Sequence, residues 1–202
     1  MTLFGASYEA ECGLNAVFRK GNAIKFILRP GESWPTDISG GSDGHRAELD
    51  GYRQIMSVGA TYWCAWQFQM DAGPISRASW LLSRQYHNAY NHWINRATQR
   101  IVFAKTGGNP IGSVPLVYGR VYSFVERIIP GTSGRVTTWV DGVLVADQAG
   151  AVTPDRYPKL GLYGDKTDPV TLTARYDNFM FGTADLTERI AAPPAATPGW
   201  LT

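Results

Sequence analysis

The chain has 202 residues, of which 44% are hydrophobic and 12% aromatic, with 22 glycines, 12 prolines and a formal net charge of +2. This composition is that of an ordered, turn-rich globular protein, and it excludes a disordered polyanion and a coiled coil. The small net charge gives no global electrostatic reason to expect binding to nucleic acid or to a membrane, although a local basic groove is compatible with it.

The predicted strands follow one another with glycine-rich turns between them. They cover residues 22–29, 61–70, 79–87, 100–105, 121–129, 135–140, 143–145, 159–163 and 170–181. The second of these alternates most clearly, because Tyr62, Cys64, Trp66, Phe68 and Met70 fall on one face. This pattern predicts a central strand with one face in the core.

Turns and the absence of helical periodicity define the fold class. Asp141-Gly142 between two strand segments predicts a two-residue type I′ hairpin. No segment keeps a 3.6-residue period with caps, so we expect helix to be confined to a turn or two. The sequence therefore predicts an all-β fold, an antiparallel β-sandwich of the jelly-roll type over residues 1–182. Residues 183–202 are expected to form an Ala/Pro-rich tail, because prolines lack the amide donor that a strand or helix needs.

The two cysteines and the first residues of the chain give weaker information about disulfide bonding and export. Cys12 and Cys64 are too few for a disulfide scaffold. Cys64 sits in an apolar strand pattern that favours a buried thiol, and a single bridge between the two stays open. The first residues show no basic start followed by an apolar run, so no signal peptide is visible, and no segment approaches the roughly 18 apolar residues of a membrane span. We expect export, if it happens, by another route or with a removed leader.

Polar side chains fall on alternate residues in three of the segments. In a strand, residues i and i+2 share one face, so each set points the same way. A sheet face that gathers an arginine, a carboxylate, an amide, an imidazole, an ammonium and phenols is either solvated or a binding groove. The residues concerned are Arg46 and Glu48 in the first segment, Gln85 and His87 in the second, and Tyr157, Lys159 and Tyr163 in the third.

These segments resemble, in order, the R-(S/A)-E-L, Q-x-H and Y-x-K-x-G-x-Y motifs of the β-jelly-roll polysaccharide lyases, which include alginate, glucuronan and heparin lyases of the concanavalin A-like fold. Tyr176-Asp177-Asn178-Phe179, followed by Gly182, resembles the closing strand of these sandwiches. Two positions depart from the alginate-type pattern. Asp50 stands where a basic residue is usual, and Pro158 where an aromatic residue is usual. Both departures concern the substrate more than the fold.

The resemblance implies cleavage of a uronate-containing acidic polysaccharide by β-elimination, without a metal or an organic cofactor. Such a reaction removes the proton at C5 and expels the sugar at O4, so donors that clamp the neighbouring carboxylate stabilise the enediolate-like transition state. A guanidinium can donate two parallel hydrogen bonds to a carboxylate, and an amide can donate one without adding a charge. An imidazole or a phenol can transfer protons. The clamp is then Arg46 with Gln85, the base and acid are His87 and Tyr163, and the substrate-binding residues are Glu48, Tyr157 and Lys159.

Other readings of the same residues remain open. A non-catalytic, lectin-like domain on a virion or another extracellular assembly would keep the same polar face, and the Ala/Pro-rich tail suits attachment to a larger particle. A glycoside hydrolase on this type of sandwich needs carboxylates in an E-x-D-x-x-E pattern, but here Glu48 and Asp50 are followed by Arg53. Taken alone, Arg46 and Glu48 also suit an ordinary ion pair of low energy. His45 and His92 match no motif and are expected to be structural.

Overall fold

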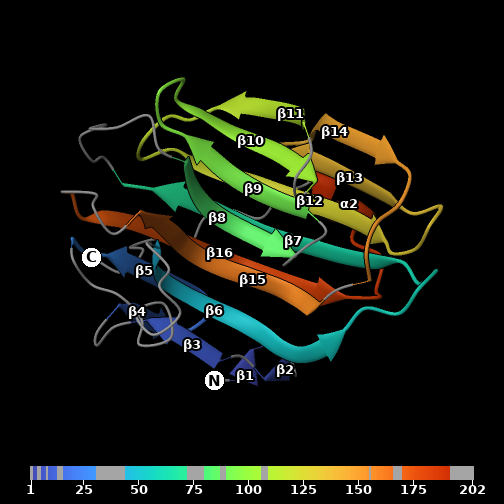
Figure 1. Cartoon of the computed structure of the whole chain (residues 1–202), viewed down its shortest axis with the longest axis horizontal. Helices are drawn as coiled ribbons and strands as arrows, with labels where there is room; N and C mark the ends of the chain where they lie inside the picture. The colour runs from blue at the N-terminus through green and yellow to red at the C-terminus, as the bar shows by residue number, and fades with distance from the viewer. Residues whose placement is uncertain are drawn as a thin grey trace.

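The chain forms a sandwich of two antiparallel β-sheets, seen in Figure 1 in a computed structural model. The structure describes residues 2–3, 6–7, 9–12, 16–30, 44–71, 80–86, 90–105, 109–154, 156–165 and 170–191, and at some strand positions, such as 51–55 and 80–86, only the backbone. Strands with one apolar face bury it by packing two sheets against each other. The predicted all-β sandwich is therefore confirmed.

We call the sheet nearer the viewer in Figure 1 the front sheet. Its strand order is β11-β10-β9-β8-β15-β6-β3. The strands are β3 (Glu9–Cys12), β6 (Gly44–Ile55), β8 (Trp80–Tyr86), β9 (Tyr90–Asn95), β10 (Arg100–Lys105), β11 (Pro110–Pro115) and β15 (Arg156–Asp165).

The other sheet, the back sheet, has the order β14-β13-β12-β7-β16-β5-β4. Its strands are β4 (Val17–Lys20), β5 (Ala23–Leu28), β7 (Tyr62–Met70), β12 (Val121–Ile129), β13 (Arg135–Val140), β14 (Val143–Ala149) and β16 (Leu172–Gly182). A separate two-stranded pair, β1 (Thr2–Leu3) and β2 (Ala6–Ser7), begins the chain.

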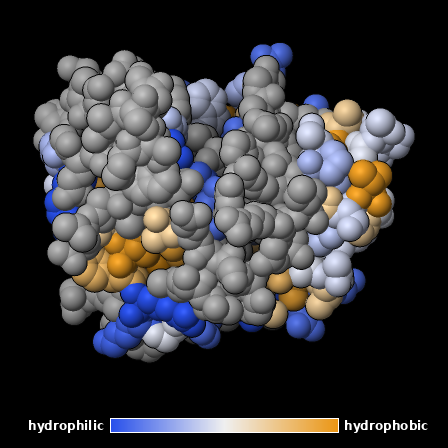
Figure 2. All heavy atoms as spheres, turned by 60° about the horizontal axis from the view of Figure 1, so that its bottom comes forward, coloured by the Kyte–Doolittle hydropathy of each residue, from blue (hydrophilic) through white to orange (hydrophobic). Residues whose placement is uncertain are grey.

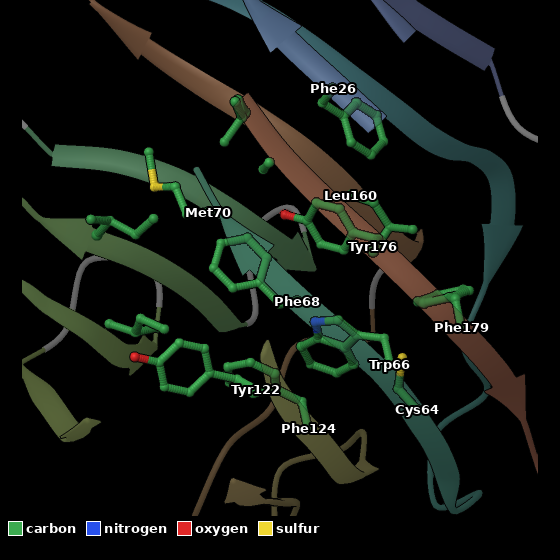
Figure 3. Packing of buried hydrophobic residues seen from close by; sticks show 14 of the residues in the cluster. Phe26, Cys64, Trp66, Phe68, Met70, Tyr122, Phe124, Leu160, Tyr176 and Phe179 are labelled. Atoms are coloured by element: carbon green, nitrogen blue, oxygen red, sulfur yellow. The ribbon is translucent and has the colours of Figure 1, made fainter. Parts of the chain in front are cut away.

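The core lies between the sheets and is rich in aromatic rings. The alternate residues of β7 that the sequence predicted to be buried all lie in this core, as Figure 3 shows for four of them. Trp66 stacks on Phe124 of β12 with ring centroids 4.9 Å apart, and Phe68 meets Tyr176 of β16 edge-on at 5.3 Å. Such ring pairs add to the burial of apolar surface, so β7, β12 and β16 form a rigid support behind the front sheet.

Local signals located some elements well and missed others. Asp141 and Gly142 have φ values of 50° and 83°, both positive, which confirms the type I′ hairpin between β13 and β14. β9 and β11 were not predicted. The asparagines of β9 weaken its strand propensity, while Pro110 and Gly112 interrupt the pattern of β11. β11 tolerates a proline because it is an edge strand.

The opposite edge of the sandwich is protected by charge. β3 and β4 are the last strands of their sheets and lie at the bottom of Figure 1. Figure 2 brings this side forward, and strongly hydrophilic residues lie there beside a patch of apolar ones. On β4, Arg19 and Lys20 are exposed next to Phe18, which is exposed as well. Basic side chains on an edge strand discourage it from pairing with another chain.

The C-terminal part of the described chain covers the outside of the back sheet. Helix α2 (Thr187–Ala191) follows Leu186, which is buried with Trp63 and Val125 in a small second apolar cluster. Residues 183–191, which the sequence placed in the tail, therefore contact the sandwich here, and residues 192–202 lie outside the described part. Within that part, no helix is long and apolar enough to cross a membrane.

Candidate functional site

Arg46 and Tyr163 lie directly opposite each other on neighbouring strands of the front sheet. The register of β6 and β15 pairs their Cα atoms, and the guanidinium carbon of Arg46 lies 4.6 Å from the centre of the Tyr163 ring. Directly opposed residues of an antiparallel pair have their side chains on the same face. The next residues along, Ala47 and Leu162, lie in the core, so Arg46 and Tyr163 are on the face turned away from it. We call this face the outer face.

Three charged residues cluster beside this pair. The ammonium nitrogen of Lys159 is 3.4 Å from Oε2 of Glu48 and 3.6 Å from Oδ2 of Asp50. Oε2 of Glu48 is also 3.7 Å from a guanidinium nitrogen of Arg46. Glu48 and Asp50 are each 2% exposed and Lys159 is 4% exposed, so these positions are not solvated. Charges this deeply buried must be paired, and Glu48 does this for both cations.

A β-bulge brings Lys159 to this cluster. The pairing with β6 runs from Leu160 opposite Leu49 to Tyr157 opposite Gly51. Pro158 and Lys159 together therefore face a single residue, Asp50. Proline has no amide hydrogen to give to the ladder, and a bulge is one of the few places in a sheet where it fits. The bulge also interrupts the strict alternation from Tyr157 to Tyr163 that the sequence pattern assumed.

Gly161 holds β15 unusually close to β6 at the centre of the cluster. It lies opposite Glu48, has a φ of 134°, and a Cβ atom there would come within 2.2 Å of the carbonyl oxygen of Ala47. On the core side, its own carbonyl accepts a hydrogen bond of 3.1 Å from the Tyr176 hydroxyl. Only glycine suits this position. The backbone under the polar cluster is thus fixed from both faces.

The remaining predicted site residues are described only in part. Gln85 of β8 is paired with Lys159 by register, which places the two residues at neighbouring positions on the sheet. Its side chain, that of Tyr157, and all of His87 lie outside what the structure describes. Of the seven predicted residues, the structure brings together the side chains of Arg46, Glu48, Lys159 and Tyr163. Their roles stay predictions.

Sequence reasoning treated Asp50 as a departure from the lyase motif and as part of an incomplete hydrolase pattern, whereas it is a member of the cluster. The signal was present, since Arg46, Glu48 and Asp50 are successive alternate residues of one strand. It also passed over β9, whose outward residues Asn91, Trp93 and Asn95 continue the outer face beyond β8. They alternate with buried neighbours at positions 90, 92 and 94.

The cluster offers donors for an anion and a hydroxyl close to them. The side chain of Arg46 is partly exposed, at 17%, so it can be reached from solvent. The Tyr163 hydroxyl belongs to a ring that this guanidinium covers. A carboxylate bound by Arg46 would therefore lie near a phenol that can transfer a proton. Within the described part of the chain, no three His, Cys, Asp or Glu side chains group as metal ligands do.

Solved structures of polysaccharide-degrading enzymes share this fold. No family model and no curated protein matches the sequence. An endo-β-1,4-glucuronan lyase from the fungus Trichoderma reesei superposes with a TM-score of 0.61 at 14% identity, over 90% of each chain. An alginate lyase from Corynebacterium sp. has a TM-score of 0.64 at 12% identity, covering 85% of this chain and 82% of that one.

A GH131 β-glucanase catalytic domain from Podospora anserina is also similar, with a TM-score of 0.58 at 12% identity over 84% of this chain and 75% of that one. At these identities the likeness shows the fold alone, which is the β-jelly-roll sandwich of the polysaccharide lyases. Because lyases and a glucanase both use it, the chemistry has to be argued from the site.

Proposed function

We propose that this protein is a polysaccharide lyase that cleaves a uronate-containing polysaccharide by β-elimination. The observation that carries the proposal is the grouping of Arg46 and Lys159 around the buried carboxylate of Glu48, with the Tyr163 ring against the Arg46 guanidinium, on the outer face of the front sheet. The similarity in fold to glucuronan and alginate lyases supports the same class of substrate.

In this mechanism the substrate carboxylate binds to the Arg46 guanidinium, with Gln85 as the second donor. A base removes the proton at C5, and the electron pair of that C–H bond forms the C4–C5 double bond. The C4–O4 bond breaks, and an acid gives a proton to the departing oxygen. We assign the proton transfers to Tyr163 and His87. Donors fixed beforehand around the developing charge contribute on the order of 3 kcal/mol each to such a reaction.

Glu48 and Lys159 hold the reacting groups in position. Glu48 is within 4 Å of both cations, so it fixes the guanidinium of Arg46 relative to β15. A clamp held this way loses little entropy when the substrate binds. Glu48 is a positioning residue in this mechanism, since the buried carboxylate acts through Arg46.

The test is incubation of the full chain with alginate, glucuronan, heparin-like polymers and bacterial capsular polysaccharides. β-Elimination leaves an unsaturated uronate at each new non-reducing end, which absorbs in the ultraviolet. New reducing ends without that absorbance would instead identify a hydrolase. Tight binding of an acidic polysaccharide whose chain length does not change on prolonged incubation would identify a carbohydrate-binding domain.

A further inference from the structure

Arg100 lies on the outer face of the front sheet, as Arg46 does. It is the first residue of β10, and Ile101 and Phe103 of the same strand lie in the core, so its side chain points outward. The side chain is partly buried. Its guanidinium donates from Nε to the Ser113 hydroxyl at 2.8 Å and from Nη2 to the Ser113 carbonyl at 3.1 Å. These two hydrogen bonds fix the guanidinium against β11.

The charge of Arg100 is not neutralised within the described part of the chain. Both of its hydrogen bonds go to oxygens of a neutral serine, and no carboxylate pairs with it there. Three other arginines, Arg120, Arg135 and Arg175, each pair with an aspartate. A charged group removed from water is normally paired, so a partly buried guanidinium with neutral partners favours an anion from outside the chain. Three of its five N–H groups take no part in the bonds to the serine and can bind that anion.

Asn95 lies directly opposite Arg100, on the neighbouring strand β9. Opposed residues of an antiparallel pair have their side chains on the same face, with Cβ atoms about 5 Å apart. The backbone amide of Thr98 donates to Oδ1 of Asn95 at 3.0 Å, so the NH2 group of this side chain is the end that can donate to another molecule. An arginine beside an amide is also the donor set proposed for the first substrate carboxylate, in Arg46 and Gln85. Arg100 and Asn95 therefore have the chemistry of a second carboxylate clamp.

The register places the two arginines on one path across the front sheet. Arg46 pairs with Tyr163, and the pairing continues through β8 to Trp93 of β9 and Val102 of β10. Arg100 is two residues along β10 from Val102, so four strand spacings and two residues separate the arginines, roughly 20 Å in all. Figure 1 shows β15, β8 and β9 between β6 and β10. A chain of several sugars, and not a single sugar, can reach from one arginine to the other.

The described residues along this path are accessible from solvent. Tyr163, Trp93, Asn95 and Arg100 are each partly exposed. Val102, on the same face of β10, is buried, so the path leaves Trp93 through Asn95, the next outward residue of β9. An indole ring offers an apolar face that suits the face of a sugar ring. A bound polysaccharide thus passes over an aromatic ring before it reaches Arg100.

We infer that Arg100 and Asn95 bind a second carboxylate of the same polysaccharide chain, several sugars away from the bond that is cleaved. The inference rests on the proposed function and deepens it, because it requires a substrate with more than one uronate and predicts tighter binding of long chains than of short ones. Contacts so far from the reacting atoms are the same in the bound substrate and in the transition state. They therefore lower KM and leave kcat unchanged.

The first test is Arg100→Ala, assayed on alginate and glucuronan, which carry a carboxylate on every sugar. We expect KM for both polymers to rise about tenfold, the effect of one lost hydrogen-bonded charge contact, with kcat close to wild type. Added salt should raise KM of the variant less steeply than KM of the wild type, because one screened charge contact is gone. Trisaccharides of the same uronates are too short to reach Arg100 from Arg46, so their kcat/KM should not change.

Asn95→Asp tests the same site with Arg100 in place. It keeps the oxygen that accepts from Thr98 and puts a carboxylate opposite the guanidinium, where it competes with the carboxylate of the substrate. KM for the two polymers should again rise about tenfold. Circular dichroism and the Tm show whether each variant is folded. The control is Arg120→Ala, which removes an equal charge from an exposed residue beside the back sheet and should leave KM unchanged.

The outcomes separate this inference from the proposed function. An unchanged KM for the polymers in both variants overturns the inference and leaves the lyase. An equal loss on trisaccharides and polymers also overturns it, since Arg100 would then act on the fold or on the reacting site. Absence of unsaturated product on every acidic polymer overturns the proposed function. Titration calorimetry of long and short chains then decides on the second clamp, because only a clamp gives a preference for long chains that both variants abolish.

Discussion

The imidazole of His92 and the carboxylate of Glu126 meet in the middle of the core and join the two sheets. Nε2 of His92, on β9, is 2.5 Å from Oε1 of Glu126, on β12, and both side chains are almost fully buried. The Thr138 hydroxyl donates to the same carboxylate oxygen at 3.3 Å, which leaves the Tyr90 hydroxyl to donate to Thr138 at 2.8 Å. This chain of hydrogen bonds fixes β9, the neighbour of β8, against the back sheet.

Glu126→Ala should therefore destabilise the protein. It leaves the buried imidazole and the Thr138 hydroxyl without their shared partner, and a buried polar group left unsatisfied costs about 1–3 kcal/mol. Urea unfolding followed by tryptophan fluorescence measures this change in the free energy of unfolding. Arg120→Ala is the control, since it removes an exposed partner of Asp141 and should cost at most about 1 kcal/mol. Equal stability of Glu126→Ala and wild type would mean that the pair contributes nothing.

Gly161→Ala should separate β15 from β6 at the site. The added methyl would lie 2.2 Å from the Ala47 carbonyl oxygen and 2.7 Å from Cα of Glu48, in a backbone conformation that side chains rarely adopt. Strain and overpacking together predict a loss of about 2–4 kcal/mol in the free energy of unfolding. Any lyase activity should fall with it, because Arg46 and Tyr163 belong to these two strands.

Gly182→Ala is the matched control for this change. A Cβ atom at Gly182 meets nothing within 4 Å, so the same substitution should leave both stability and activity close to wild type. Thermal unfolding and initial rates of the two variants are compared side by side. Similar effects at both glycines would contradict the close approach at Gly161.

Tyr163→Phe tests the proposed proton transfer. Loss of one hydroxyl that moves a proton should lower kcat by about a hundredfold or more, while polysaccharide binding survives. Arg46→Ala should weaken both binding and turnover, because it removes the group that holds the substrate carboxylate. Tyr118→Phe, between β11 and β12, is the control and should behave like wild type. A Tyr163→Phe variant with unchanged kcat would exclude Tyr163 from the proton transfer.

The ion pair between Asp147 and Arg135 should stabilise the fold at neutral pH and lose this effect in acid. Arg135 donates two hydrogen bonds to this carboxylate, at 2.7 and 2.5 Å, and thereby holds the pKa of Asp147 below its usual value of 3.8. A depressed folded-state pKa means that the contribution is present above 3.8 and is lost as the pH falls through the lower value. The stability difference between wild type and Asp147→Asn should therefore vanish in strong acid. A nuclear magnetic resonance titration that places the Asp147 midpoint at or above 3.8 would contradict this.

Part of the outer face could be predicted from the sequence because the relevant information is local. Two-residue periodicity assigns Arg46 and Glu48 to one face whatever the rest of the chain does, and the same rule identified the core face of β7. The Asp141-Gly142 turn was predictable for the same reason, since positive φ values at two successive residues favour Asp-Gly. No long-range contact is needed for any of these assignments.

Tertiary structure decided which local features meet. The bulge at Pro158 and Lys159 depends on the pairing of β15 with β6, two strands about a hundred residues apart, and it brings Lys159 opposite Asp50. The His92–Glu126 pair depends on the packing of two sheets, so alternation within β9 or β12 gave no sign of it. The sequence by itself determined the fold class, the core faces of its clearest strands and the residue types of the site. Only the tertiary structure decided which of their charges meet, because charge pairing depends on distances between strands that the order of residues does not specify.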